Sequence, residues 1–317
     1  MALRSLGTTG LQIPTLVFGG NVFGWTVDEK QSFSLLDALL ERGFTAIDTA
    51  DVYSRWAPGN KGGESETIIG NWLAAHPGTR DKVTLFTKVG ADMGEAGKKG
   101  LSARWITQAV EDSLRRLQTD YIDLYFSHWP DSETAYDETL GAYEKLLKAG
   151  KIRAIGASNL NAEQLSESLK VADANGLPRY QVLQPEYNLY DRSSFEGALQ
   201  DLTIRENIGV VTYYSLASGF LSGKYRSEKD LSQSQRGQGI AKYLNPRGFA
   251  IVEALESVAA SHNVKPAEVA LAWLIQQPGV TAPIASATKL AHIDSFVTAV
   301  SLNLSTDEIA VLNKAGA

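Results

Sequence analysis

The chain contains no cysteine, and this absence excludes both a disulfide framework and a thiolate metal site. The sequence also lacks the run of about 18 uninterrupted apolar residues that a membrane-spanning helix requires. Its start, "MALRSLGTTG", has no long apolar stretch behind a basic end, so no signal peptide is predicted. We therefore expect a soluble, cytoplasmic protein with no metal site and no membrane partner.

Positive charge is scarce as well. Lysine and arginine together number 30 against 36 acidic residues, which gives a formal net charge of −6. The densest basic segments, "GKKG" at 97–100 and "LRRL" at 114–117, are too short to follow a phosphate backbone. A general nucleic-acid partner is therefore disfavoured on electrostatic grounds.

The 317 residues do contain a regular alternation of short apolar runs with longer amphipathic stretches. Each run is apolar almost throughout, as expected for strands of a parallel sheet that is covered on both faces. Eight strands are predicted, at residues 16–18, 45–47, 83–87, 122–126, 154–155, 182–183, 210–213 and 281–284. This pattern predicts a (β/α)8 TIM barrel in which residues 1–317 form one domain. The alternative, an open doubly wound sheet, lacks its G-x-G-x-x-G fingerprint after the first strand.

The helical stretches between the strands have recognisable ends. One stretch ends at Gly43, which suits a left-handed C-terminal cap, and another begins at Ser102, a typical N-cap. Capping boxes are predicted at Asn161 and Ser305, and Pro266 is expected in the first turn of a helix.

Two segments depart from this alternation. The apolar pieces "ALRSL" and "LQIP" flank "GTTG", which predicts an N-terminal β-hairpin ahead of the barrel. Residues 218–248 are polar, glycine-rich and too long for a routine connection. Such a segment is a candidate functional loop or lid.

Ionisable side chains recur where neighbouring strands end. Asp48 ends the second strand and Tyr53 follows it; Lys88 comes 40 residues after Asp48, and His128 comes 40 residues after Lys88. One βα unit of this barrel spans about 40 residues, so the four side chains are expected together at the C-terminal rim, where barrel enzymes place their chemistry. Taken singly, each has a structural explanation: a helix cap, a loop tyrosine, a lysine reaching water and a packed histidine.

Together, these residue types suit proton delivery to an oxygen atom. A phenol with a pKa of about 10 is a poor donor at pH 7, and an adjacent ammonium is expected to lower that pKa. Asp48 would hold Lys88 charged and oriented, and His128 would orient or polarise a carbonyl oxygen. A general-acid site is therefore predicted at the ends of three neighbouring strands.

Nearly the whole chain resembles the aldo-keto reductase family. The similar segments are "LGTTGLQIPTLVFGG", "FTAIDTADVYS", "GGESETIIGNWL", "LFTKVG", "SLRRLQTDYIDLYFSHWPD", "IRAIGASNL", "QPEYN" and "YYSLASGFLSGKY". The resemblance implies a barrel reductase in which Asp48, Tyr53, Lys88 and His128 form the catalytic tetrad with Tyr53 as proton donor. It also implies reversible hydride transfer between NADPH, with NADH as an alternative, and the carbonyl of an aldehyde, ketone or sugar.

The same resemblance assigns a set of residues to the nicotinamide cofactor. Asp48 belongs to this set as well as to the tetrad. The carboxamide would contact Ser158, Asn159 and Gln184, and Tyr213 would stack on the nicotinamide ring. Tyr214, Ser215 and Leu216 follow the stacking ring as cofactor-binding residues, and those along the pyrophosphate would be Gly219, Leu221, Gly223 and Lys224. Residues at the adenosine end would be Ser286, Thr288, Lys289 and His292.

Trp25, Trp56 and Trp129 follow the first, second and fourth strands and are expected to wall the substrate pocket. Three indoles suit flat, apolar and sugar-like carbonyl compounds equally, and packing at the rim is their structural alternative. Two other functions stay open at this point. One is a cofactor-binding regulatory module that acts on a partner protein. The other, a glycosidase, would need a second rim carboxylate, for which Asp51 lies too near Asp48.

Overall fold

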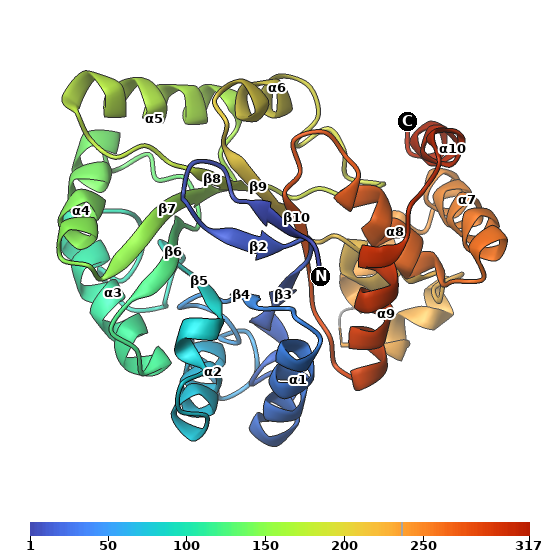
Figure 1. Cartoon of the computed structure of the whole chain (residues 1–317), viewed down its shortest axis with the longest axis horizontal. Helices are drawn as coiled ribbons and strands as arrows, with labels where there is room; N and C mark the ends of the chain where they lie inside the picture. Colours follow the sequence, from blue (N-terminus) through green and yellow to red (C-terminus); the bar gives the residue numbers. More distant parts are fainter. Residues whose placement is uncertain (236) are drawn as a thin grey trace.

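The computed structural model describes residues 1–235 and 237–317, so one residue of the predicted lid, Arg236, lies outside the described residues. Within those two ranges, eight parallel strands close into a barrel in the order β10-β3-β4-β5-β6-β7-β8-β9 (Figure 1). The strands are β3 Val17–Gly19, β4 Ala46–Asp48, β5 Thr84–Val89, β6 Ile122–Ser127, β7 Ile152–Ser158, β8 Val182–Gln184, β9 Gly209–Thr212 and β10 Ala282–Ala285. All eight predicted strands and the TIM-barrel fold are confirmed.

Helices surround the barrel (Figure 1). They are α1 Glu29–Glu41, α2 Glu64–Ala75, α3 Ala103–Leu117, α4 Tyr136–Lys148, α5 Ala162–Asn175, α6 Ala198–Arg205, α7 Pro246–His262, α8 Pro266–Ile275, α9 Leu290–Ser301 and α10 Thr306–Ala315. Across the described ranges, none of them is both long and apolar enough to cross a membrane.

The predicted helix ends are confirmed by the cap geometry. Ser102 accepts a hydrogen bond from the backbone of α3, and Asn161 and Ser305 each form a capping box. Gly43 adopts the left-handed φ of +82° just after α1, and Pro266 is the first residue of α8. Each cap satisfies backbone groups that a helix end leaves without partners.

The interior of the barrel is filled by side chains rather than by solvent. A cluster of buried apolar residues from the strands includes Val17, Phe86, Phe126 and Val211, all 0% exposed. Gly156 makes room for this packing, because a Cβ atom there would lie 2.5 Å from the Phe126 ring. A barrel packed in this way leaves its ends as the places where a ligand can bind.

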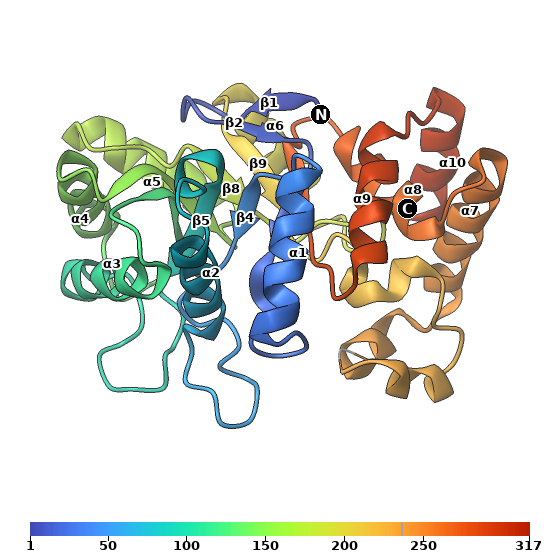
Figure 2. The ribbon, with the colours of Figure 1, turned by 60° about the horizontal axis from the view of Figure 1, so that its bottom comes forward.

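The predicted hairpin closes one of these ends. Strands β1 Leu3–Ser5 and β2 Gln12–Pro14 pair antiparallel, and Leu6 and Ile13 pack into the interior cluster of the barrel. Gly7 lies so close to the starts of two strands that a Cβ there would be 2.5 Å from the backbone nitrogen of Gly209. Figure 2 shows the hairpin at one end of the molecule and long loops at the other.

The segment between β9 and α7 contains three short 3-10 helices, η3 Ala217–Ser222, η4 Glu228–Gln233 and η5 Gly237–Tyr243. Two others, η1 Gly20–Val22 and η2 Arg80–Lys82, follow β3 and precede β5. The segment is anchored by Phe220, whose ring stacks on Tyr243 at 5.3 Å, and by an ion pair between Arg226 and Glu256. The predicted loop is therefore partly helical and packs against α7 and α8.

Candidate active site

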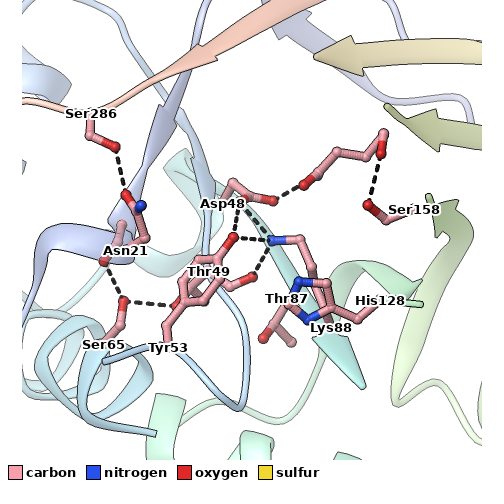
Figure 3. A network of polar contacts seen from close by, with 12 residues as sticks. Asn21, Asp48, Thr49, Tyr53, Ser65, Thr87, Lys88, His128, Ser158 and Ser286 are labelled. Carbon is pink, nitrogen blue, oxygen red and sulfur yellow. Dashed lines mark hydrogen bonds and ion pairs between the residues drawn. The ribbon is translucent and has the colours of Figure 1, made fainter. Parts of the chain in front are cut away.

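Three neighbouring strands bring the predicted tetrad to the end of the barrel opposite the hairpin. Asp48 is the last residue of β4, Lys88 lies next to the end of β5, and His128 directly follows β6. Tyr53 lies in the turns after β4, and this segment leans on β5 through the backbone N–H of Asp51, which donates to the Lys88 carbonyl at 3.3 Å. Figure 3 shows the four side chains gathered together.

A buried ammonium forms the centre of the group. Lys88 Nζ donates to Asp48 Oδ2 at 2.7 Å, to the Thr49 carbonyl at 2.8 Å and to the Tyr53 hydroxyl at 2.9 Å. The side chains of Lys88 and Asp48 are 0% and 2% exposed. Tyr53 donates a long bond of 3.3 Å to the same carboxylate oxygen, and Gln184 Nε2 donates to the other oxygen at 3.0 Å. Each proton of the ammonium has a partner, so Lys88 is held in one place.

The pKa of Tyr53 corrects one expectation. Burial raises the pKa of the Tyr53 phenol well above its usual value, and the Asp48 carboxylate raises it further. Burial also lowers the pKa of Lys88, although Asp48 opposes this shift. The prediction that the neighbouring ammonium gives the phenol a lowered pKa is therefore wrong, because burial and the Asp48 carboxylate raise it. The phenol is fully protonated at neutral pH.

His128 is the neutral member of the group. Burial lowers the pKa of its imidazole well below the usual value, and the nearby Lys88 charge lowers it further. Its ring centre lies 6.0 Å from that of Tyr53, in an edge-on arrangement. Its buried Nδ1 atom has no hydrogen-bond partner within residues 1–235 and 237–317. A neutral imidazole with a free ring nitrogen can donate or accept one further hydrogen bond.

A second polar chain adjoins the tetrad. Ser158 Oγ donates to the Gln184 carbonyl at 2.7 Å, Asn159 Nδ2 donates to the His128 carbonyl at 2.9 Å, and the Tyr213 hydroxyl donates to Asn159 Oδ1 at 2.6 Å. Asn159 has a φ of +62°, a left-handed conformation that asparagine tolerates better than most residues. The structure thus brings the predicted carboxamide residues and Tyr213 beside the tetrad.

These residues open onto a cavity of about 1080 Å³. Most of the predicted site residues line it: Asp48, Tyr53, Trp56, His128, Trp129, Ser158, Asn159, Gln184, Tyr213, Tyr214, Ser215, Leu216, Gly219, Lys224, Ser286, Thr288, Lys289 and His292. Four do not contribute to the wall. Lys88 lies buried behind it, and Trp25 packs edge-on against Trp56 at 5.6 Å. The Leu221 side chain belongs to the hydrophobic core, and Gly223 forms the C-cap of η3.

One part of the cavity wall is basic. Lys224, Lys289 and His292 meet there with Lys265, which precedes α8. Burial lowers the pKa of His292, and the three lysine charges lower it further. Lys265 also contacts Ser295 Oγ at 3.2 Å. A concentration of cations of this kind suits a phosphate group.

Several wall residues were not predicted from the sequence. Lys265, Pro266, Ala267 and Leu271 come from the start of α8, and Asn21 and Val22 come from η1. Asn21 accepts from Ser286 Oγ at 2.7 Å, a contact that joins β10 to the first βα connection (Figure 3). The sequence gives no signal for these contacts, because they depend on how helices pack around the closed barrel. In the described part of the chain, no group of three or more histidine, aspartate or glutamate side chains is placed to hold a metal ion.

Comparison with known proteins agrees with this arrangement. Residues 15–317 match the model of the aldo/keto reductase family. The chain is 32% identical to protein tas of Escherichia coli, over 98% of this chain and 96% of that protein. It is 33% identical to aldo-keto reductase YhdN of Bacillus subtilis, over 99% and 93%. It is 31% identical to a protein of Arabidopsis thaliana named as a probable voltage-gated potassium channel subunit beta, over 95% and 91%. The chain therefore belongs to the aldo/keto reductase family and is an oxidoreductase that acts on carbonyl compounds.

Proposed function

We propose that residues 1–317 act as one domain that reduces the carbonyl group of an aldehyde, ketone or sugar with NADPH, and that Tyr53 is the proton donor. One observation carries this proposal: the Tyr53 hydroxyl lies 2.9 Å from a fully buried ammonium and lines the cavity. A protonated phenol in that position can give up its proton to an oxygen atom, and the ammonium then stabilises the phenolate that forms.

The residues around the cavity fit a nicotinamide dinucleotide. Ser158, Asn159 and Gln184 offer the hydrogen-bonding groups that a carboxamide needs, and the partly exposed Tyr213 offers a flat face. The basic part of the wall suits the 2′-phosphate of NADPH, which favours NADPH over NADH. When bound, the cofactor supplies the hydride.

Each side chain of the tetrad has its own part in the proposed proton transfer. The Tyr53 hydroxyl gives only a long 3.3 Å bond to Asp48, so a substrate oxygen can replace the carboxylate as its acceptor at little cost. Lys88 faces the hydroxyl oxygen and offsets the negative charge that grows there as the proton leaves. The neutral His128 donates to, and so orients, the same substrate oxygen. Asp48 keeps the ammonium charged in its buried place.

The Tyr53→Phe variant tests the proton donor. It keeps the ring contacts with Trp56 and His128 but removes the acidic hydroxyl. We expect kcat to fall by about 10²- to 10⁴-fold, the usual worth of a general acid. The affinity for NADPH, measured by fluorescence titration, should change by less than about twofold, since binding does not use the proton.

The matched control is Tyr136→Phe, which removes a hydroxyl on α4 outside the cavity and should leave turnover unchanged. Turnover is followed by the loss of NADPH absorbance with a panel of aldehydes, ketones and sugars. A Tyr53→Phe protein that keeps most of its rate would rule out the assigned donor. Tight NADPH binding by the unaltered protein without turnover of any carbonyl would instead favour a cofactor-binding regulatory module.

A further inference from the structure

The large aromatic side chains that the protein leaves exposed gather in one place. Among the described residues, the exposed aromatic side chains are Trp56, Trp129 and Tyr214, and all three line the cavity. They are 48%, 48% and 50% exposed. A group of large aromatic side chains that are left about half exposed in one cavity marks a binding surface.

The three rings come from three different loops and adjoin the proposed proton donor. The Trp56 ring lies 6.0 Å from that of Tyr53, and Trp129 stacks on His128 at 5.8 Å with an angle of 16° between the rings. The Tyr214 ring lies 5.1 Å from that of Tyr213, whose hydroxyl donates to Asn159 beside the tetrad, and it lines the same cavity as Tyr53. A carbonyl compound with its oxygen at the Tyr53 hydroxyl would therefore have its remaining atoms among these rings.

No free cation adjoins this part of the cavity within residues 1–235 and 237–317. The lysines of the wall are Lys224, Lys265 and Lys289, and they gather around His292. Lys88, which does lie beside Tyr53, already donates to three partners and is fully buried. A carboxylate or phosphate on the substrate would lose its hydration there without gaining a counter-charge.

The wall of the cavity also includes apolar side chains. Val22, Val52 and Ala91 line it. A sugar can stack on an indole, but its several hydroxyl groups would lose hydration against apolar side chains without a hydrogen bond in return. A flat apolar body meets no such penalty.

The backbone of Tyr214 has a strained conformation that leaves its ring beside the cavity. Its φ is +52°, in the left-handed region that a bulky residue rarely adopts. The conformation is fixed by two hydrogen bonds to its carbonyl, from Asn188 Nδ2 at 3.0 Å and from the backbone N–H of Ala217 at 2.7 Å. The ring is left half exposed rather than packed. Strain that is maintained beside a cavity is typical of a residue kept for binding.

Taken with the proposed carbonyl reduction, on which it rests, the geometry points to a substrate class. We infer that the substrate is an uncharged aromatic aldehyde or ketone, whose ring packs among Trp56, Trp129 and Tyr214 while its carbonyl oxygen meets Tyr53. Tyr214 is accordingly a specificity residue for the substrate rather than a contact of the cofactor.

A set of matched aldehydes tests this inference in the intact enzyme with NADPH. Benzaldehyde is the flat uncharged probe, 4-formylbenzoate adds a charge, and xylose replaces the ring with a polyol. We expect kcat/KM for benzaldehyde to exceed that for each of the other two by at least tenfold. Turnover of 4-formylbenzoate or xylose at the rate of benzaldehyde would overturn the inference while leaving the proposed reduction intact.

Two variants test whether the exposed aromatic side chains select the substrate. Trp129→Leu and Tyr214→Leu should each lower kcat/KM for benzaldehyde, through KM, by about three- to tenfold more than they lower that for the small aliphatic probe propanal. Phe249→Leu, on α7 outside the cavity, is the control and should change neither. Equal losses for both probes would contradict an aromatic contact.

A binding measurement separates this inference from the proposed reaction. Benzyl alcohol is the product of benzaldehyde reduction, and its binding to the enzyme with NADP⁺ is measured by calorimetry. It should bind at least tenfold more tightly than 4-(hydroxymethyl)benzoate, and Tyr214→Leu should weaken it about three- to tenfold. This pattern without turnover of any aldehyde would support the binding surface and refute the proposed reduction; equal affinities would refute the binding surface.

Discussion

Asp51 offers a quantitative test of the structure through the pH dependence of stability. Its side chain is 1% exposed, and neither carboxyl oxygen has a hydrogen-bond partner within the described ranges. Burial raises the pKa of Asp51 well above its usual value, and the nearby Glu66 raises it further, against the opposing charges of Arg116 and Lys88. The folded protein therefore holds a proton on Asp51 at a pH where the unfolded chain has released it.

The direction in which stability changes with pH follows from this difference in proton binding between the folded and unfolded states. At low pH, below the unfolded pKa of about 3.9, both states bind the proton and the folded state has its full stability. As the pH rises toward the folded pKa, the unfolded state gains by releasing the proton, and the free energy of unfolding falls by about 1.4 kcal/mol per pH unit. Above the folded pKa, the loss is complete and constant.

The Asp51→Asn variant removes the titratable carboxyl group while keeping the shape of the side chain. Its stability relative to the unaltered protein should therefore rise by about 1.4 kcal/mol for each pH unit from about pH 4 up to the folded pKa of Asp51, and then level off. The amide brings two N–H groups that lack acceptors, which adds a cost independent of pH. The test is therefore the slope of this stability difference against pH, and not its value at any one pH.

Equilibrium urea unfolding, followed by tryptophan fluorescence between pH 5.0 and 8.5, measures the slope. Asp173→Asn is the control, because that side chain is 59% exposed and its substitution should give a difference that does not vary with pH. A difference between Asp51→Asn and the unaltered protein that is flat over this range would refute the reasoning. It would mean that Asp51 is ionised in the folded protein.

Further substitutions test other parts of the structure. Lys88→Met should cost about 3–5 kcal/mol of stability in urea unfolding, because it leaves a buried carboxylate unpaired, and adding Asp48→Asn should recover part of that loss without restoring turnover. A double variant no more stable than the single one would contradict this. Gly70→Ala should cost about 1–3 kcal/mol, because its Cβ would lie 2.0 Å from a backbone oxygen of α3, whereas Gly141→Ala, in open space on α4, should stabilise by about 0.4–1 kcal/mol. Similar effects at both positions would be inconsistent with the helix packing. Lys289→Ala should weaken NADP⁺ binding about two- to fivefold by calorimetry, a small effect because the side chain is exposed, and should leave NAD⁺ binding unchanged. Unchanged NADP⁺ affinity would remove Lys289 from the proposed phosphate site.

The fold was predictable because its signals are local and repeated. Each strand is a short apolar run, and several helices carry their own start or stop residue, such as Ser102 or Gly43. The rule that barrels gather chemistry at the C-terminal ends of their strands then places Asp48, Lys88 and His128 together without any knowledge of long-range packing. Their contacts, at 2.7 Å between Lys88 and Asp48 for example, agree with that prediction.

The parts that were missed depend on packing between distant segments. Lys265 enters the cavity wall because α8 packs against η3 and β10, which no local pattern reveals. Leu221 lies in the glycine-rich loop for which a phosphate contact is predicted, and the packing of its side chain in the core is likewise not visible in any local pattern. The direction of the Tyr53 pKa shift was also missed, because it depends on how completely the phenol is enclosed. Enclosure is a property of the folded protein as a whole.

Because the pKa of Tyr53 is raised, the charges around the phenol decide how easily it loses its proton. Two ion pairs lie behind it, Lys88 with Asp48 and Arg116 with Glu66, so the buried charges there balance. An ionised Asp51 would add a third negative charge beside Lys88 and would oppose the phenolate that the proposed proton transfer leaves on Tyr53. Because burial favours the neutral form of Asp51, the charges stay balanced and the Lys88 ammonium can stabilise that phenolate. It follows that Asp51→Asn, which is also neutral, should keep its turnover at neutral pH even where its stability differs.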